Sequence, residues 1–261
     1  MSRFLKWFLW TGIVFLYVPI VVLIIYSFNA SRRGNVWGGF STFWYGELFR
    51  DTAILDAAWT SFKIGVYSAT SATLLGVMAS VALVRFGAFK GRALFSGLVS
   101  APLVMPEVIT GISLLLLFIS TEQLFGWPGG RGVLTITIAH ITFCTAFVIV
   151  VIQPRLVDMD CSLEEASRDL GAGAGTTFFL ITLPLLVPAL MSAWLLAFIL
   201  SFDDLVIASF TSGPGATTLP MLIFSKVKIA VSPDINALAT LIIVSVGLGL
   251  AFVMLGLRRR R

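Results

Sequence analysis

Long apolar runs constrain this chain more than any other feature. A helix needs about 20 predominantly apolar residues to cross the hydrocarbon core of a bilayer. Within that core every backbone N–H and C=O must find a partner inside the protein, and a helix supplies one locally. Apolar stretches of this length occur at residues 7–28, 61–84, 93–119, 133–152, 185–210 and 237–257. The pattern predicts an all-α polytopic membrane protein with six transmembrane helices in a single domain, residues 1–261.

The composition agrees with a membrane protein. The chain is 58% hydrophobic and 12% charged, with a mean hydropathy of +0.99, whereas soluble domains are about 25% charged. The first apolar run exceeds the roughly 7–15 residues of a signal-peptide core, so we expect it to be retained. Cys144 and Cys161 provide no disulfide framework, and we expect both thiols to be reduced.

Lysine and arginine residues predict the orientation of the chain. Cytoplasmic loops carry an excess of these residues. With the N-terminus inside, eleven of the 18 lie on inner segments and seven on outer segments. Much of the difference comes from the arginines at 258–261, which follow an apolar run and indicate membrane anchoring, not nucleic-acid binding. Both termini are therefore predicted to be cytoplasmic, as is the segment after the fourth span. Residues 218–229 are predicted to form a short helix at the outer interface.

The segment between the fourth and fifth apolar runs, residues 161–184, is polar and rich in glycine. Ser162 and Glu165 have the spacing of a capping box, which predicts a short helix starting there. Gly171 stands where a left-handed C-cap is favoured, and a second helix is expected from about Thr176. By these local features alone, an ordinary loop between two spans remains the alternative.

Nucleotide, metal and catalytic sites are not indicated. The glycine-rich residues 171–177 lack the lysine of a Walker A loop and do not fit G-x-G-x-x-G. His140 is the one histidine, and such a residue within a span more often forms packing hydrogen bonds than binds a metal. Asp203 and Asp204 are the candidate acid pair for an intramembrane enzyme, but adjacent helical residues point about 100° apart. We therefore expect neither a cofactor nor an enzyme.

The segment at 161–184 resembles the EAA motif of binding-protein-dependent ABC importer permeases. That motif reads E-A-A, three residues, G, nine residues and I-x-L-P, and every spacing matches. The matching residues are Glu165, Ala166, Ser167, Gly171, Ile181, Leu183 and Pro184. Ser167 departs from the usual alanine, and we expect little consequence because serine is also small.

The resemblance implies a type I ABC importer permease in the bacterial inner membrane. Its cytoplasmic coupling helix, between spans four and five, would dock into a cleft on an ATPase that binds and hydrolyses the ATP. The implied partners are a homologous second permease subunit, two copies of the ATPase and a periplasmic binding protein. A stand-alone secondary transporter or channel would not need the EAA spacing.

Most of the chain further resembles the second permease subunit of polyamine importers. The resemblance includes "IIYSFNAS" at 24–31, "APLVMPEVITGISLLLLF" at 101–118 and the whole stretch 200–240. It implies putrescine or spermidine as the substrate. An importer for another small solute, such as an amino acid or a peptide, is the alternative.

Acidic residues inside spans are costly and usually functional. Their negative charge would suit a cationic substrate such as a polyamine. Counted along continuous helices from the inner face, Glu107 and Asp203 both lie about 21–22 Å deep. Together with Asp204 they would share one level of a pathway, where Phe202 or Tyr45 could add cation–π attraction. Alternatively, the two aspartates form a solvated helix end and Glu107 bonds an N–H freed near Pro106. Prolines at 102, 106 and 188 are expected to kink the third and fifth spans.

Overall fold

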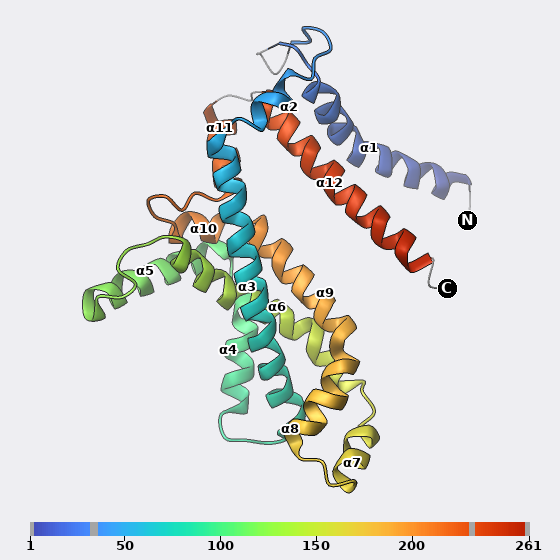
Figure 1. The fold of residues 1–261 in the computed structure, drawn as a ribbon, viewed down its shortest axis with the longest axis vertical. Helices are drawn as coiled ribbons and strands as arrows, with labels where there is room; N and C mark the ends of the chain where they lie inside the picture. The colour runs from blue at the N-terminus through green and yellow to red at the C-terminus, as the bar shows by residue number, and fades with distance from the viewer. Residues whose placement is uncertain (1–2, 32–35, 230–232, 259–261) are drawn as a thin grey trace. The chain divides into compact units, whose positions relative to one another are not determined.

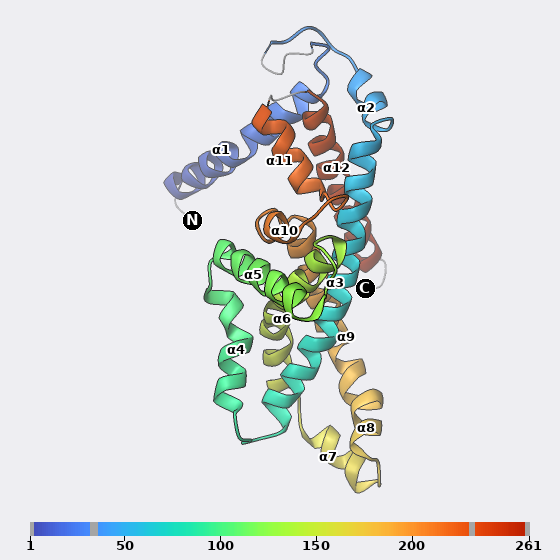
Figure 2. The same cartoon turned by 90° about the vertical axis from the view of Figure 1, so that its left-hand side faces the viewer.

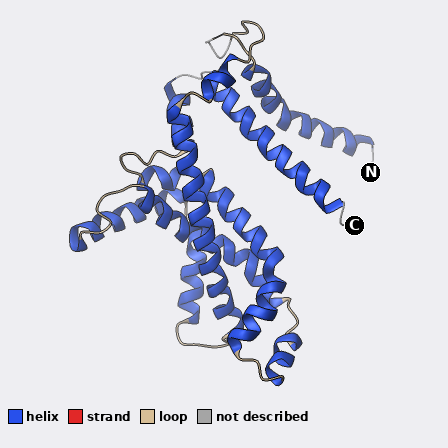
Figure 3. Ribbon diagram, viewed as in Figure 1, coloured by secondary structure: helices blue, strands red, loops and turns tan. Residues whose placement is uncertain are grey.

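The structure is a computed structural model that describes residues 3–31, 36–229 and 233–258. Helices account for nearly all of the described chain, as Figure 3 shows. An isolated antiparallel bridge pairs Asn29 with Phe40. The all-α prediction is confirmed. The residues group into two compact units, Met1–Asp56 with Leu222–Arg261, and Ala57–Met221, and each is described by itself.

The first unit combines both ends of the chain (Figure 1). It contains α1 (Arg3–Ser27), α2 (Phe43–Leu48), most of α11 (Leu219–Ile229) and α12 (Pro233–Arg258). Helix α12 packs against α1 and α2. The ammonium of Lys226 lies 2.9 Å from Asp51 Oδ2 and 3.1 Å from Asp234 Oδ2, and so joins α11 to α12 and to the segment before α3. The short helix predicted at 218–229 is confirmed as α11.

The second unit is built around three long helices (Figures 1 and 2). Its elements are most of α3 (Thr52–Arg85), α4 (Arg92–Val104), α5 (Glu107–Phe125), α6 (Val133–Val157), α7 (Ser162–Asp169), α8 (Ala174–Thr177), the π-helical turn η1 (Phe178–Thr182), α9 (Leu183–Phe202) and α10 (Val206–Thr211). Helices α6 and α9 pack along each other. Small residues of these two helices, including Ala139, Ala193 and Ala197, are fully buried, and small side chains let membrane helices approach closely.

Five helical stretches in the described residues are long and apolar enough to cross a membrane. They are Arg3–Ser27, Thr52–Arg85, Glu107–Phe125, Val133–Val157 and Ala174–Phe202. Helix α4 and the Pro233–Leu248 part of α12 are apolar but shorter. The chain is thus a membrane protein, while the count of six spans is not confirmed. The side chains of α12 beyond Leu248 and the arginines at 259–261 lie outside the described residues.

The third predicted span, 93–119, is divided in two. Helix α4 ends at Val104, Met105 is extended with φ −76° and ψ 135°, and α5 begins at Glu107 after Pro106. Proline lacks an N–H and disfavours the helical conformation in the residue before it, which explains the break. Figures 1 and 2 show α4 and α5 running in different directions. The depth assigned to Glu107 from a continuous helix was therefore wrong.

The other prolines expected to interrupt these spans behave differently. Pro102 and Pro188 both lie inside helices, α4 and α9 respectively. The fifth predicted span, 185–210, is instead interrupted after Phe202, where Asp203 forms the C-cap of α9 and α10 begins three residues later, at Val206. The interruption expected at Pro106 is therefore confirmed, whereas those expected at Pro102 and Pro188 are not, and the break after Phe202 was not predicted.

The close contact between α3 and α6 gives a test of the packing. A Cβ atom added at Gly76 would lie 2.8 Å from Val148 Cβ and closer still to its Cγ1, whereas one at Gly97 on α4 would meet no atom within 4 Å. Alanine is preferred to glycine in helices by about 0.5–1 kcal/mol, but overpacking costs about 1–3 kcal/mol. We expect Gly76→Ala to lower the thermal unfolding midpoint of the purified protein, and Gly97→Ala to leave it unchanged or raise it. An undiminished midpoint for Gly76→Ala would contradict this packing.

Candidate coupling segment and substrate pathway

The segment 161–184 forms two short helices joined by a glycine turn. Helix α7 ends at Asp169, and Gly171 follows with φ +86°, the left-handed conformation predicted for it. The N–H groups of Gly171 and Ala172 donate to the carbonyl oxygens of Arg168 and Ser167, which closes the end of the helix. Helix α8 then begins at Ala174, two residues before the predicted start. Figures 1 and 2 show α7 at the opposite end of the second unit from α10.

The start of α7 differs from the predicted capping box. Ser162 is the first helical residue, and its N–H donates to Asp160 Oδ1 at 2.9 Å. The N–H of Glu165 donates to the carbonyl oxygen of Cys161. An aspartate readily bonds the backbone two residues ahead, so Asp160 takes the role expected of Ser162. This N–H bond also lowers the pKa of the exposed Asp160 carboxyl from its ordinary value. The side chain of Glu165 is exposed and does not cap the helix.

The neighbouring acid, Glu164, is the residue that the sequence argument missed. Its side chain is 9% exposed, and Oε2 lies 3.2 Å from Nε of Arg85, the last residue of α3. The hydroxyl of Thr182 donates to Glu164 Oε1 at 2.9 Å. Arg85 also approaches the Cys161 sulfur, with Nη1 3.5 Å from Sγ. One carboxylate therefore connects α7 with α3 and with η1.

The remaining motif residues lie on α7, on η1 and at the start of α9. The Ser167 hydroxyl lies 3.0 Å from that of Thr177, a hydrogen bond that the usual alanine would not form. Ile181 lines an open groove of about 330 Å³, and Leu183 and Pro184 form the first turn of α9. The groove is lined mainly by apolar side chains, with Leu163, Ala166, Leu170 and Leu180 among them. Leu163 on α7 is exposed, as is Leu170, its C-cap residue, so this segment presents both apolar and acidic groups on its surface.

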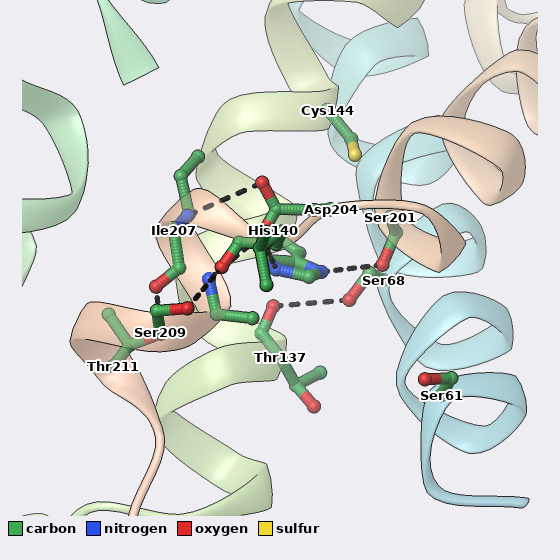
Figure 4. Close-up of polar contacts among 12 residues, drawn as sticks. Ser61, Ser68, Thr137, His140, Cys144, Ser201, Asp204, Ile207, Ser209 and Thr211 are labelled. Carbon is green, nitrogen blue, oxygen red and sulfur yellow. Dashed lines mark hydrogen bonds and ion pairs between the residues drawn. The ribbon is translucent and has the colours of Figure 1, made fainter. Parts of the chain in front are cut away.

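The break between α9 and α10 is organised by Asp204 (Figure 4). Its side chain is 5% exposed, and Oδ2 lies 3.1 Å from His140 Nε2 on α6. Asp204 Oδ1 and Oδ2 accept hydrogen bonds from the N–H groups of Ile207 and Ala208, at 3.3 and 2.7 Å. The other His140 nitrogen, Nδ1, lies 2.7 Å from the Ser201 hydroxyl oxygen. Asp204 thus caps α10 and ties it to α6, and the packing role expected of His140 is confirmed.

The two adjacent aspartates differ in environment. Asp203 is the C-cap residue of α9 and is exposed, while Asp204 is enclosed by hydrogen-bond donors. A solvated helix end describes Asp203 but not Asp204. The ring of Phe202, beside them, stacks on Phe198 with centroids 5.6 Å apart. The aromatic ring of Phe202 and the exposed carboxylate of Asp203 therefore occupy consecutive positions. Asp204 instead holds α10 in place through its hydrogen bonds.

The other predicted pathway residues, Glu107 and Tyr45, lie on other elements. Glu107 is the exposed first residue of α5, and the N–H groups of Ile109 and Thr110 donate to the Pro106 carbonyl oxygen. Helix α5 packs against α10. Tyr45 belongs to the first unit, where its hydroxyl oxygen lies 2.7 Å from that of Ser27.

Within the described residues, no group of three or more histidine, cysteine, aspartate or glutamate side chains could hold a metal ion. Cys144 is buried, Cys161 is exposed, and neither forms a disulfide with the other in the described residues. The acidic residues described above therefore act as helix caps or in ion pairs, or lie exposed at or near helix ends.

Comparison with known proteins places this geometry in a family. Residues 72–260 match the model for the binding-protein-dependent transport system inner membrane component. The putrescine transport system permease protein PotI of Escherichia coli K12 is 59% identical over 237 residues, which cover 91% of this chain and 84% of PotI. The spermidine/putrescine transport system permease protein PotC of Haemophilus influenzae is 40% identical over 257 residues, covering 98% and 96%. These relatives are transport permeases and not enzymes.

Solved structures resemble the fold at much lower sequence identity. A bacterial ABC transporter that imports the acidic polysaccharide alginate superposes with a TM-score of 0.71 at 18% identity, covering 97% of this chain and 98% of the other. An amino acid ABC transporter solved with histidines has a TM-score of 0.59 at 18% identity, covering 84% and 98%. The predicted importer-permease fold is confirmed. The chain belongs to the family of binding-protein-dependent transport system inner membrane components.

Proposed function

We propose that this protein is a transmembrane subunit of an ABC importer that moves putrescine or spermidine into the bacterial cytoplasm. The observation that carries the proposal is α7, a polar helix held between two apolar ones and ended by Gly171 in a left-handed turn. The substrate class is supported by the 59% identity to the putrescine permease PotI over 91% of the chain.

The proposed partner at α7 is the ATPase subunit, which binds and hydrolyses the ATP. Glu165 on α7 and Leu170, the C-cap residue of α7, are exposed and offer a charge and an apolar side chain to a complementary cleft. Burial of such a mixed surface is typical of protein interfaces. The complex would further contain a homologous permease subunit, a second ATPase copy and a periplasmic polyamine-binding protein. Both termini and α7 would face the cytoplasm.

The proposed contact for the amine is the exposed carboxylate of Asp203, with Phe202 beside it and Glu107 as a second acid. An ammonium group that leaves water loses several kcal/mol unless partners replace its hydration. A carboxylate supplies charge, and an aromatic face adds cation–π attraction. Asp204 is assigned to the scaffold and not to the amine, because its oxygens already accept bonds from Ile207 and Ala208 and pair with His140.

The first prediction concerns coupling. Gly171→Ala places a Cβ in the left-handed region at a cost of about 1–2 kcal/mol, and Glu165→Lys reverses an exposed charge. We expect both variants to lose uptake and to retain less ATPase on co-purification, with membrane insertion unchanged. Gly175→Ala is the matched control, since a Cβ there meets no atom within 4 Å and its φ is not positive. Wild-type uptake and an intact complex in both test variants would refute the docking role.

The second prediction concerns orientation. Reporter fusions after Asp169 and after Arg261 should give a cytoplasmic signal, because lysine and arginine are enriched on those segments. A fusion after Ser212, which follows α10, should give a periplasmic signal. Paired phosphatase and fluorescent-protein reporters at each position distinguish the two sides. A cytoplasmic signal after Ser212 would overturn the proposed topology.

The third prediction separates the two aspartates. Asp203→Asn and Glu107→Gln keep shape and remove charge, so we expect slower amine uptake in a fully assembled complex. Asp204→Asn weakens the hydrogen bonds at the start of α10, where a bond to a charged group contributes about 1.5–3 kcal/mol. It should therefore lower the unfolding midpoint as well as uptake. The measurements are uptake at matched membrane expression and thermal unfolding in detergent. Full transport by both Asp203→Asn and Glu107→Gln would exclude these acids from the pathway.

A further inference from the structure

We propose that the ion pair between Glu164 and Arg85 transmits the movement of α7 to α3, so that the coupling helix acts on two transmembrane helices at once. The inference rests on the proposed docking of an ATPase at α7. It concerns a different residue from those that would contact the ATPase, because Glu164 points into the protein and Glu165 is exposed.

The chain itself connects α7 to only two of the long helices of its unit. Residues 158–161 lead to α7 from α6, and α8 with η1 leads from it into α9. Helix α3 ends at Arg85, far from α7 in sequence, so only side chains can join them. In the described part of the chain, Arg85 of α3 forms an ion pair with Glu164 on α7 and also contacts the sulfur of Cys161, the N-cap residue of α7.

The geometry shares one carboxylate between two helices. Glu164 Oε2 lies 3.2 Å from Arg85 Nε, and Oε1 accepts the hydroxyl proton of Thr182 on η1 at 2.9 Å. Displacing α7 therefore moves Arg85 and Thr182 with Glu164, or separates the ion pair with Arg85 and breaks the hydrogen bond from Thr182. The end of α3 is also held from its other side, where Arg92 of α4 donates to the Leu83 carbonyl oxygen at 2.9 Å. A shift of α3 would in this way reach α4.

The low exposure of Arg85 and Glu164 to water strengthens their electrostatic attraction. The side chains of Arg85 and Glu164 are 18% and 9% exposed, and they border a crevice of about 110 Å³ lined in part by Val81, Phe86 and Phe178. Charges are screened less where water is largely excluded. The attraction therefore persists over a small change in separation, whereas an apolar contact loses much of its energy over a gap of 0.5–1 Å.

Stability alone does not account for this pair. Removing two charges from water is costly, and replacing a buried ion pair with packed apolar residues is often neutral or stabilising. A pair that only held the fold together would thus be replaceable by apolar side chains. A pair that transmits movement would not, and this difference defines the test.

The experiment reconstitutes the complete complex in proteoliposomes and measures putrescine imported per ATP hydrolysed. The test variants are Glu164→Gln and the apolar double variant Arg85→Met with Glu164→Leu. The control is Asp158→Asn, which removes an exposed acid from the loop before α7. We expect both test variants to assemble and hydrolyse ATP, with the import ratio lowered about 5-fold or more, in the usual range for coupling between sites. The control should keep the wild-type ratio.

Two results would overturn the inference. A wild-type import ratio in the apolar double variant would assign the pair to packing. Loss of the ATPase from the purified double variant would assign it to the docking surface. Failure of the proposed function is distinguishable from either result, because the wild-type complex would then neither retain an ATPase nor import putrescine.

Discussion

An interruption in a membrane helix frees backbone N–H and C=O groups that lipid cannot satisfy, and each costs several kcal/mol if it stays unpaired. The break after Phe202 depends on this constraint. Asp204 accepts the N–H groups of Ile207 and Ala208, and His140 on α6 holds the same carboxylate. The direction of α10, and with it the packing of α5 on α10, follows from this one buried side chain.

Features encoded in neighbouring residues could be predicted from the sequence. Apolar runs located the long helices, Gly171 located the turn that ends α7, and residues 218–229 located α11. Each of these features depends on a local backbone preference or on the length of an apolar run, and both can be read from a single sequence. The break at Pro106 was also predictable, since proline acts locally on the conformation of Met105.

Contacts between residues distant in sequence could not be predicted in the same way. Nothing near Glu164 identifies Arg85 as its partner, and nothing near Asp204 identifies His140. The misplaced capping box had a different, local origin, because Asp160, two residues before Ser162, accepts its N–H at the start of α7. The choice between two adjacent acids, one buried and one exposed, is made by tertiary packing that the apolar pattern does not encode.

The same physical solution occurs at both sites of interest. Glu164 and Glu165 are adjacent, as are Asp203 and Asp204, and in each pair one carboxylate is buried while the other is exposed. On α7, neighbouring side chains diverge by about 100°, so Glu164 and Glu165 face two environments. Asp203 and Asp204 lie in the non-helical segment between α9 and α10, where the bend of the chain separates them. The buried member fixes the backbone through Arg85 or His140, and that anchoring holds the exposed member in position without using its charge. An exposed acid on a fixed backbone loses less conformational entropy when it binds a partner or a cation. The two adjacent acids at each site therefore have separate roles. The buried carboxylate holds the backbone, and the exposed carboxylate stays available to bind a partner or a cation.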